Sequence, residues 1–156
     1  MKLQEFLSPF VNKKFTILYS FTYSLIGNEK EAENIFFDSF TAFLLENSNK
    51  IEAIFSPDNY SRREKDLFHL ILMSVVAQKE LLLAKTNPRP YEEKYFLLGL
   101  YERAILFLRH KTNLELSEIS EIAGLQINKV VSLLQSARKF LSSEDFTSEL
   151  FQYEVL

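Results

Sequence analysis

Residues 114–141 read LELSEISEIAGLQINKVVSLLQSARKFL, and this stretch decides the fold class. Ile119, Ile122 and Ala123 predict a short helix with one buried face. Gly124 then supplies the positive φ that a sharp turn requires. The apolar residues of the following helix recur at steps of 4, 3 and 4 and form a buried stripe: Val130, Leu134, Ala137 and Leu141. Two short helices around a glycine turn are typical of a DNA-reading helix-turn-helix, and a plain helical hairpin is the alternative.

The opposite face of the second helix holds the candidate DNA contacts. These are the polar and cationic residues Asn128, Lys129, Ser132, Gln135, Arg138 and Lys139. Residues 126–141 contain three cations and no acid, which suits weak contact with phosphates. Cations near the C-terminal end of a helix also stabilise the helix itself, so the basic patch alone does not decide between the two readings.

Almost all of the remaining chain predicts helix, and the expected fold class is all-α. One helix over 12–26 ends at Gly27, and Asn28 is placed to cap the next, which runs to about Leu45. A loop over 47–61 leads to one long helix over 66–85. Further helical segments cover 92–111 and part of the tail.

The segment KTNPRPY, residues 85–91, has two prolines within three residues and cannot continue a helix. We therefore expect two small helical subdomains, 1–84 and 92–156, joined by this Pro-containing linker, with the helix-turn-helix in the second.

Composition excludes several classes of protein. The chain has 156 residues, 47% of them hydrophobic, and its 18 Lys and Arg against 21 Asp and Glu give a net charge of −3. No apolar run is long enough to span a membrane. The absence of cysteine excludes disulfides and thiolate metal sites and favours the cytoplasm.

The sequence offers little chemistry for an enzyme. His69 and His110 lie in different halves with no metal-ligand spacing, and the three glycines form no phosphate loop. We expect no catalysis, no metal and no cofactor. His110 stands beside Arg109 and Lys111 at a helix end, where a cation would suit the helix dipole.

Two different sets of residues follow one another along the chain, one in each half. The first comprises Leu25, Gly27, Ala32, Glu33, Ile35, Asp38, Ser39 and Phe40. The second begins with Leu98, Arg103, Ile105, Leu108 and Arg109. It continues through Leu114, Glu118, Ile119, Gly124, Leu125, Val130, Ser132, Leu134, Ala137, Arg138 and Leu141. In this order, the two sets resemble the two conserved regions of bacterial sigma factors of the extracytoplasmic-function type.

The resemblance implies a transcription initiation subunit that binds core RNA polymerase and promoter DNA. In that family the first motif lies on the helix that docks on polymerase. In this chain the corresponding face belongs to the helix that runs to about Leu45 and lies opposite the apolar stripe of that helix. It carries Glu33, Asn34, Phe37, Asp38 and Thr41. The following long helix opens the promoter, and the C-terminal helix-turn-helix reads the upstream element.

Departures from the family pattern keep a second hypothesis open. Lys129 stands where the family has Thr, and three cations of its recognition helix are replaced by Val131, Leu133 and Ser136. The long helix offers few polar groups, namely His69, Ser74, Gln78 and Lys79. For base stacking it offers only Phe68 and His69, and a place in the core is the favoured interpretation of both. An apolar surface in these places favours a sigma look-alike that binds protein, such as an anti-sigma factor. An unrelated helical regulator or interaction module is the third hypothesis.

Overall fold

The computed structural model describes residues 3–46 and 60–142, with side chains for 15–46 and 64–142. Throughout these residues the regular secondary structure is helical, which confirms the all-α class. The short helix expected around Phe146 and Leu150, and most of the expected 47–61 loop, lie outside the described residues.

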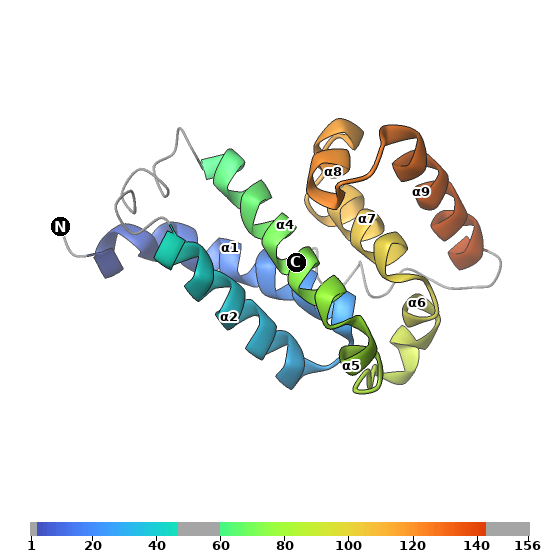
Figure 1. Ribbon diagram of the computed structural model, residues 1–156, viewed down its shortest axis with the longest axis horizontal. Helices are drawn as coiled ribbons and strands as arrows, with labels where there is room; N and C mark the ends of the chain where they lie inside the picture. Colours follow the sequence, from blue (N-terminus) through green and yellow to red (C-terminus); the bar gives the residue numbers. More distant parts are fainter. Residues whose placement is uncertain (1–2, 47–59, 143–156) are drawn as a thin grey trace.

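The first half is built on a helical hairpin of α1 (Leu3–Ile26) and α2 (Glu29–Glu46) (Figure 1). The chain turns at Gly27, whose φ is 69°. The side-chain oxygen of Asn28 accepts the backbone N–H of Glu31 at 3.0 Å, which confirms the predicted cap. Phe15 on α1 lies edge-on to Phe36 and Phe40 of α2, with ring centroids 5.1 and 4.8 Å away. The apolar stripe of α2 therefore packs on α1 as its spacing predicts.

The prediction of one long helix over 66–85 is wrong in two respects. α4 covers Tyr60–Ala77 and so begins earlier than predicted. A separate short helix, α5, covers Lys79–Leu83. The break falls at Gln78, with φ −114° and ψ 20°. No glycine or proline marks this position, so the residue pattern gives no stop signal. α4 contacts α1, α2 and α8, and its largely apolar circumference suits this central place in the bundle.

The second half starts with a short 3-10 turn, η2 (Pro90–Glu92), and α6 (Glu93–Phe96). α7 (Leu100–Lys111), α8 (Leu116–Ala123) and α9 (Ile127–Ser142) follow and contact one another pairwise (Figure 1). The predicted helical segment over 92–111 is thus a pair of helices, divided before Gly99.

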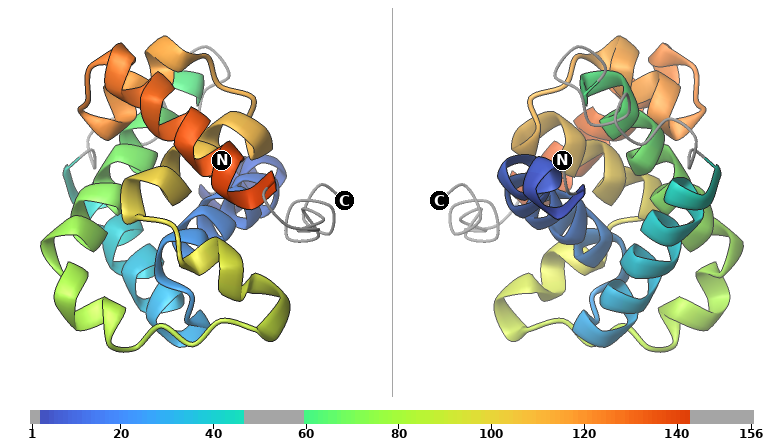
Figure 2. Two further views of the ribbon diagram at one scale, coloured as in Figure 1. Left: turned by 90° about the vertical axis from the view of Figure 1, so that its right-hand side faces the viewer. Right: turned by 90° about the vertical axis from the view of Figure 1, so that its left-hand side faces the viewer.

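The halves on either side of 85–91 pack together. α1 contacts α7 and α4 contacts α8, and the end-on views of Figure 2 show all these helices gathered in one body. Phe21 of α1 lies 5.0 Å from Phe68 of α4 and 5.5 Å from Phe107 of α7, ring centroid to ring centroid. A single apolar core therefore runs through both halves. The division into 1–84 and 92–156 stays a prediction about domains.

Candidate functional site

The hairpin of α8 and α9 turns where the glycine was expected. Gly124 has φ 68° and donates its N–H to the carbonyl of Ser120 at 2.9 Å. Leu125 N–H donates to the same carbonyl at 3.2 Å, while the Ser120 hydroxyl donates to the Leu125 carbonyl. These bonds close the last turn of α8 and fix the direction in which α9 departs. The geometry is that of the predicted hairpin, and its use in reading DNA stays a prediction.

α9 has one buried and one exposed side. The predicted stripe is buried in full: Val130, Leu134, Ala137 and Leu141. The six predicted DNA contacts are all exposed: Asn128, Lys129, Ser132, Gln135, Arg138 and Lys139. At 3.6 residues per turn five of them share one face, and Arg138 lies at its edge.

Arg138 points toward α7 rather than straight out from the face. Its Nε donates to Nε2 of His110 at 3.3 Å, and its Nη2 lies at the same distance from that ring nitrogen. Burial lowers the pKa of His110, and the neighbouring cations Arg138, Arg109 and Lys111 lower it further. The cations at the end of α7 are therefore Arg109 and Lys111, while His110 accepts from Arg138 as a neutral ring. Lys129 and Lys139 are left as the outward-facing cations of α9.

The apolar residues that stand in place of two of the family's cations lie at the edges of the exposed face, as their helical positions predict. Val131 and Leu133 are both half-buried, and Leu133 packs against the core. They therefore lie at the flanks of α9 and do not form an open apolar patch.

α2 presents the candidate docking face. All five predicted residues are exposed: Glu33, Asn34, Phe37, Asp38 and Thr41. The phenylalanine keeps 51% of its surface exposed, although Phe36 beside it is buried. Two carboxylates flank it and give the face an acidic character. Leu45, which was not among the predicted residues, is 73% exposed and continues the step of four from Phe37 through Thr41.

α4 turns its apolar side into the core, and its role in opening a promoter stays a prediction. Phe68 is fully buried, so base stacking by this residue is excluded in this arrangement. Nδ1 of His69 lies 2.7 Å from the carbonyl oxygen of Ile122 on α8. Lys65 pairs with Glu118 of α8 at 3.4 Å. Lys65 and His69 thus contact α8, although His69 stays largely exposed.

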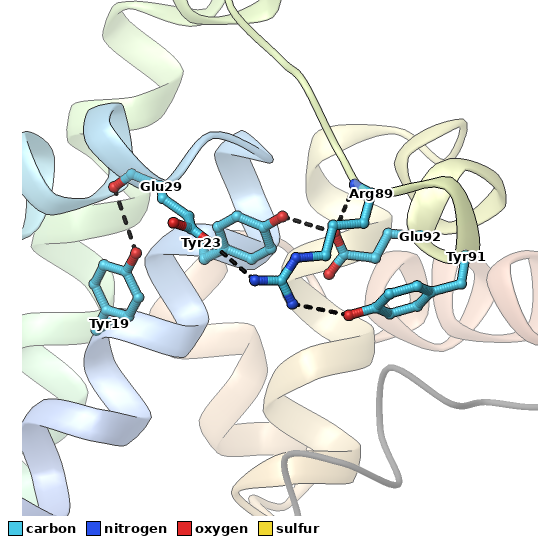
Figure 3. A network of polar contacts seen from close by, with 6 residues as sticks. All are labelled: Tyr19, Tyr23, Glu29, Arg89, Tyr91 and Glu92. Carbon is cyan, nitrogen blue, oxygen red and sulfur yellow. Dashed lines mark hydrogen bonds and ion pairs between the residues drawn. The ribbon is translucent and has the colours of Figure 1, made fainter.

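A polar network fastens the α1–α2 corner to η2 (Figure 3). The hydroxyl of Tyr23 donates to Oε1 of Glu92 at 2.6 Å, and the same oxygen accepts Arg89 N–H at 3.0 Å. Arg89 also pairs with Glu29 at 2.9 Å and donates to the Tyr91 hydroxyl at 2.9 Å. Burial and the hydrogen bond to Glu92 raise the pKa of Tyr23.

Within the described residues, no group of three or more potential metal ligands occurs. In that same part of the chain, no helix is both long and apolar enough to cross a membrane. Comparison with family models, with curated protein sequences and with solved structures finds no match to this chain.

Proposed function

We propose that the chain is a sigma-like transcription initiation factor that works in the cytoplasm. The α2 face binds core RNA polymerase, and α9 contacts promoter DNA. The observation that carries the proposal is the exposure of both predicted sets of residues on two separate helices. These helices lie toward opposite ends of the molecule in Figure 1, so one does not block the other.

The two faces differ in the chemistry they offer. α2 combines an exposed aromatic ring with carboxylates, and an aromatic anchor within a polar surround is a frequent form of protein interface. α9 offers Lys129 and Lys139 for phosphates and short polar side chains for bases. Two cations support only weak binding of DNA by the chain alone. Attachment to polymerase raises the effective concentration of α9 at DNA and offsets this weakness.

The decisive experiment is titration of the purified chain against bacterial core RNA polymerase, read by co-elution in size exclusion. Co-elution at submicromolar concentration is expected. Phe37→Ala and Asp38→Ala should weaken it. Leu81→Ala and Glu80→Ala are matched controls, because both residues are exposed and lie on a different helix, α5. No binding at tens of micromolar would show the proposal to be wrong.

A second candidate is a sigma look-alike that binds protein, for example an anti-sigma factor. Exposed Phe37 and Leu45 on α2 favour it, because apolar side chains in an acidic surround suit a protein partner. The inward orientation of α4 favours it too. Under this reading Phe37→Ala weakens binding to an anti-sigma factor while polymerase is not bound at all.

A further inference from the structure

Residues 85–87 do not cross freely between the halves but are hydrogen-bonded along the α1–α2 corner. The Lys85 carbonyl accepts from Asn28 Nδ2 at 2.9 Å. The Thr86 hydroxyl donates to the Ile26 carbonyl at 2.9 Å, and Asn87 N–H donates to the Gly27 carbonyl at 2.8 Å. Together with the Tyr23–Glu92 bond, these contacts make residues 85–92 a strap. The strap ties the start of the second half to the first.

Arg103 on α7 forms a second attachment. The side chain is only 7% exposed and reaches the C-terminal end of α1. Its Nε donates to the Ser24 carbonyl at 3.1 Å, and its Nη2 donates to the Leu25 carbonyl at 2.8 Å. Its Nη1 donates to the Leu98 carbonyl. Separating α7 from α1 would leave carbonyls at a helix C-terminus without this cation, where its charge suits the helix dipole.

The seam between α4 and α8 follows from these two attachments. With α7 held on α1, α8 lies against α4, where the Lys65–Glu118 ion pair and the His69–Ile122 contact join them. Phe21 of α1, Phe68 of α4 and Phe107 of α7 form an apolar layer that joins the two halves, and all three are almost completely buried. Opening it would expose these rings to water, which the hydrophobic effect opposes.

We propose that the chain works as one rigid body in which the strap and Arg103 keep α8 on α4, so that the side of α4 that faces α8 stays closed to nucleic acid. This inference rests on the proposed function for its consequence. The protein positions polymerase through α2 and α9, but α4 does not hold the opened DNA strand. A rigid chain of this kind differs from two subdomains that move independently on a linker.

The chain has no cysteine, so spin labels can be placed without background. Glu80→Cys and Ser117→Cys put labels at exposed positions on α5 and α8, one in each half. Pulsed electron paramagnetic resonance should give one narrow distance distribution in the free protein. The same distribution should persist after core RNA polymerase is added. A broad distribution in the free protein, or a second, longer distance with polymerase, would overturn the rigid body.

A covalent lock tests the consequence for binding. Lys65→Cys with Glu118→Cys, joined by a short bifunctional maleimide, fixes α4 to α8, and both native side chains are partly exposed. The locked protein should match the unlinked double variant within about twofold in affinity for polymerase and for a labelled single-stranded oligonucleotide. A loss of about tenfold or more on locking would show that the seam must open. If neither form binds polymerase, the proposed function fails. The spin-label distances of the free protein then still decide the rigid body.

Discussion

At Gly27 two separate physical requirements for glycine coincide. Its φ of 69° lies in the left-handed region, and a Cβ built there would come within 2.9 Å of both the Phe96 ring and the Thr86 methyl group. Gly124 has nearly the same φ, 68°, but open space around the added carbon. Comparing a substitution at Gly124 with one at Gly27 therefore separates the cost of backbone strain from the cost of a steric clash.

We predict that Gly124→Ala lowers the free energy of unfolding by about 1–2 kcal/mol, the cost of a left-handed residue with a Cβ. Gly27→Ala should cost about 1–3 kcal/mol more, because the ring or the strap must shift. Urea unfolding of both variants measures the difference. Equal effects would mean that Phe96 and Thr86 move aside without cost.

His110 gives a prediction about pH. Its folded-state pKa is lowered, first by burial and then by nearby cations, from the ordinary value of 6.5. The unfolded chain therefore binds the proton more readily, and stability falls as pH drops below 6.5 toward the folded pKa. His110→Gln keeps an acceptor for Arg138 but does not titrate. Chemical unfolding between neutral and mildly acidic pH should show a shallower pH dependence in this variant, and an unchanged slope would contradict the prediction.

Helix ends with a local chemical cause were predictable from the sequence. Gly27, Asn28 and Gly124 mark their turns because the left-handed conformation and the side-chain cap are properties of single residues. The break at Gln78 was not predictable, since neither glycine nor proline marks it. The faces of α2 and α9 followed from helical spacing. The direction of Arg138 did not, because it depends on His110, which lies 28 residues away.

For α9 we predict a small but residue-specific salt dependence of binding to duplex DNA. Lys129→Ala and Lys139→Ala should each reduce the slope of log affinity against log salt by about 0.9, as expected for one phosphate contact. Arg138→Ala should change it less, because its guanidinium group is held on His110. Fluorescence anisotropy between about 50 and 200 mM salt measures the slopes. Lys30→Ala on α2 is the control. A slope that falls equally in this variant would place the DNA contact elsewhere.

At the scale of the whole molecule, the contacts that join the halves were beyond prediction from the sequence. The prolines of 85–91 correctly excluded a helix, yet nothing local shows that Thr86 and Asn87 bind the α1–α2 corner about 60 residues earlier. Arg103 was noted only as part of a motif. Its role depends on which carbonyls the fold brings to it.

Two tyrosines on successive turns of α1 allow this long-range attachment to be tested. Tyr23 donates at 2.6 Å to Glu92, a carboxylate that is only 2% exposed. Tyr19 donates at 3.4 Å to the backbone carbonyl of Glu29, at an exposed position. Substitution by Phe keeps both aromatic rings and removes only the hydroxyl groups.

We predict that Tyr23→Phe lowers the free energy of unfolding by about 1–3 kcal/mol, because a buried carboxylate loses a hydrogen bond. Tyr19→Phe should stay within about 0.5 kcal/mol of the native chain, because its hydroxyl makes only a long hydrogen bond at an exposed position. Hydrogen exchange localises the effect: the Asn87 amide, bonded to the Gly27 carbonyl, should exchange faster in Tyr23→Phe and not in Tyr19→Phe. Equal stabilities, or an unchanged Asn87 rate, would show that the strap is held without the Tyr23–Glu92 bond.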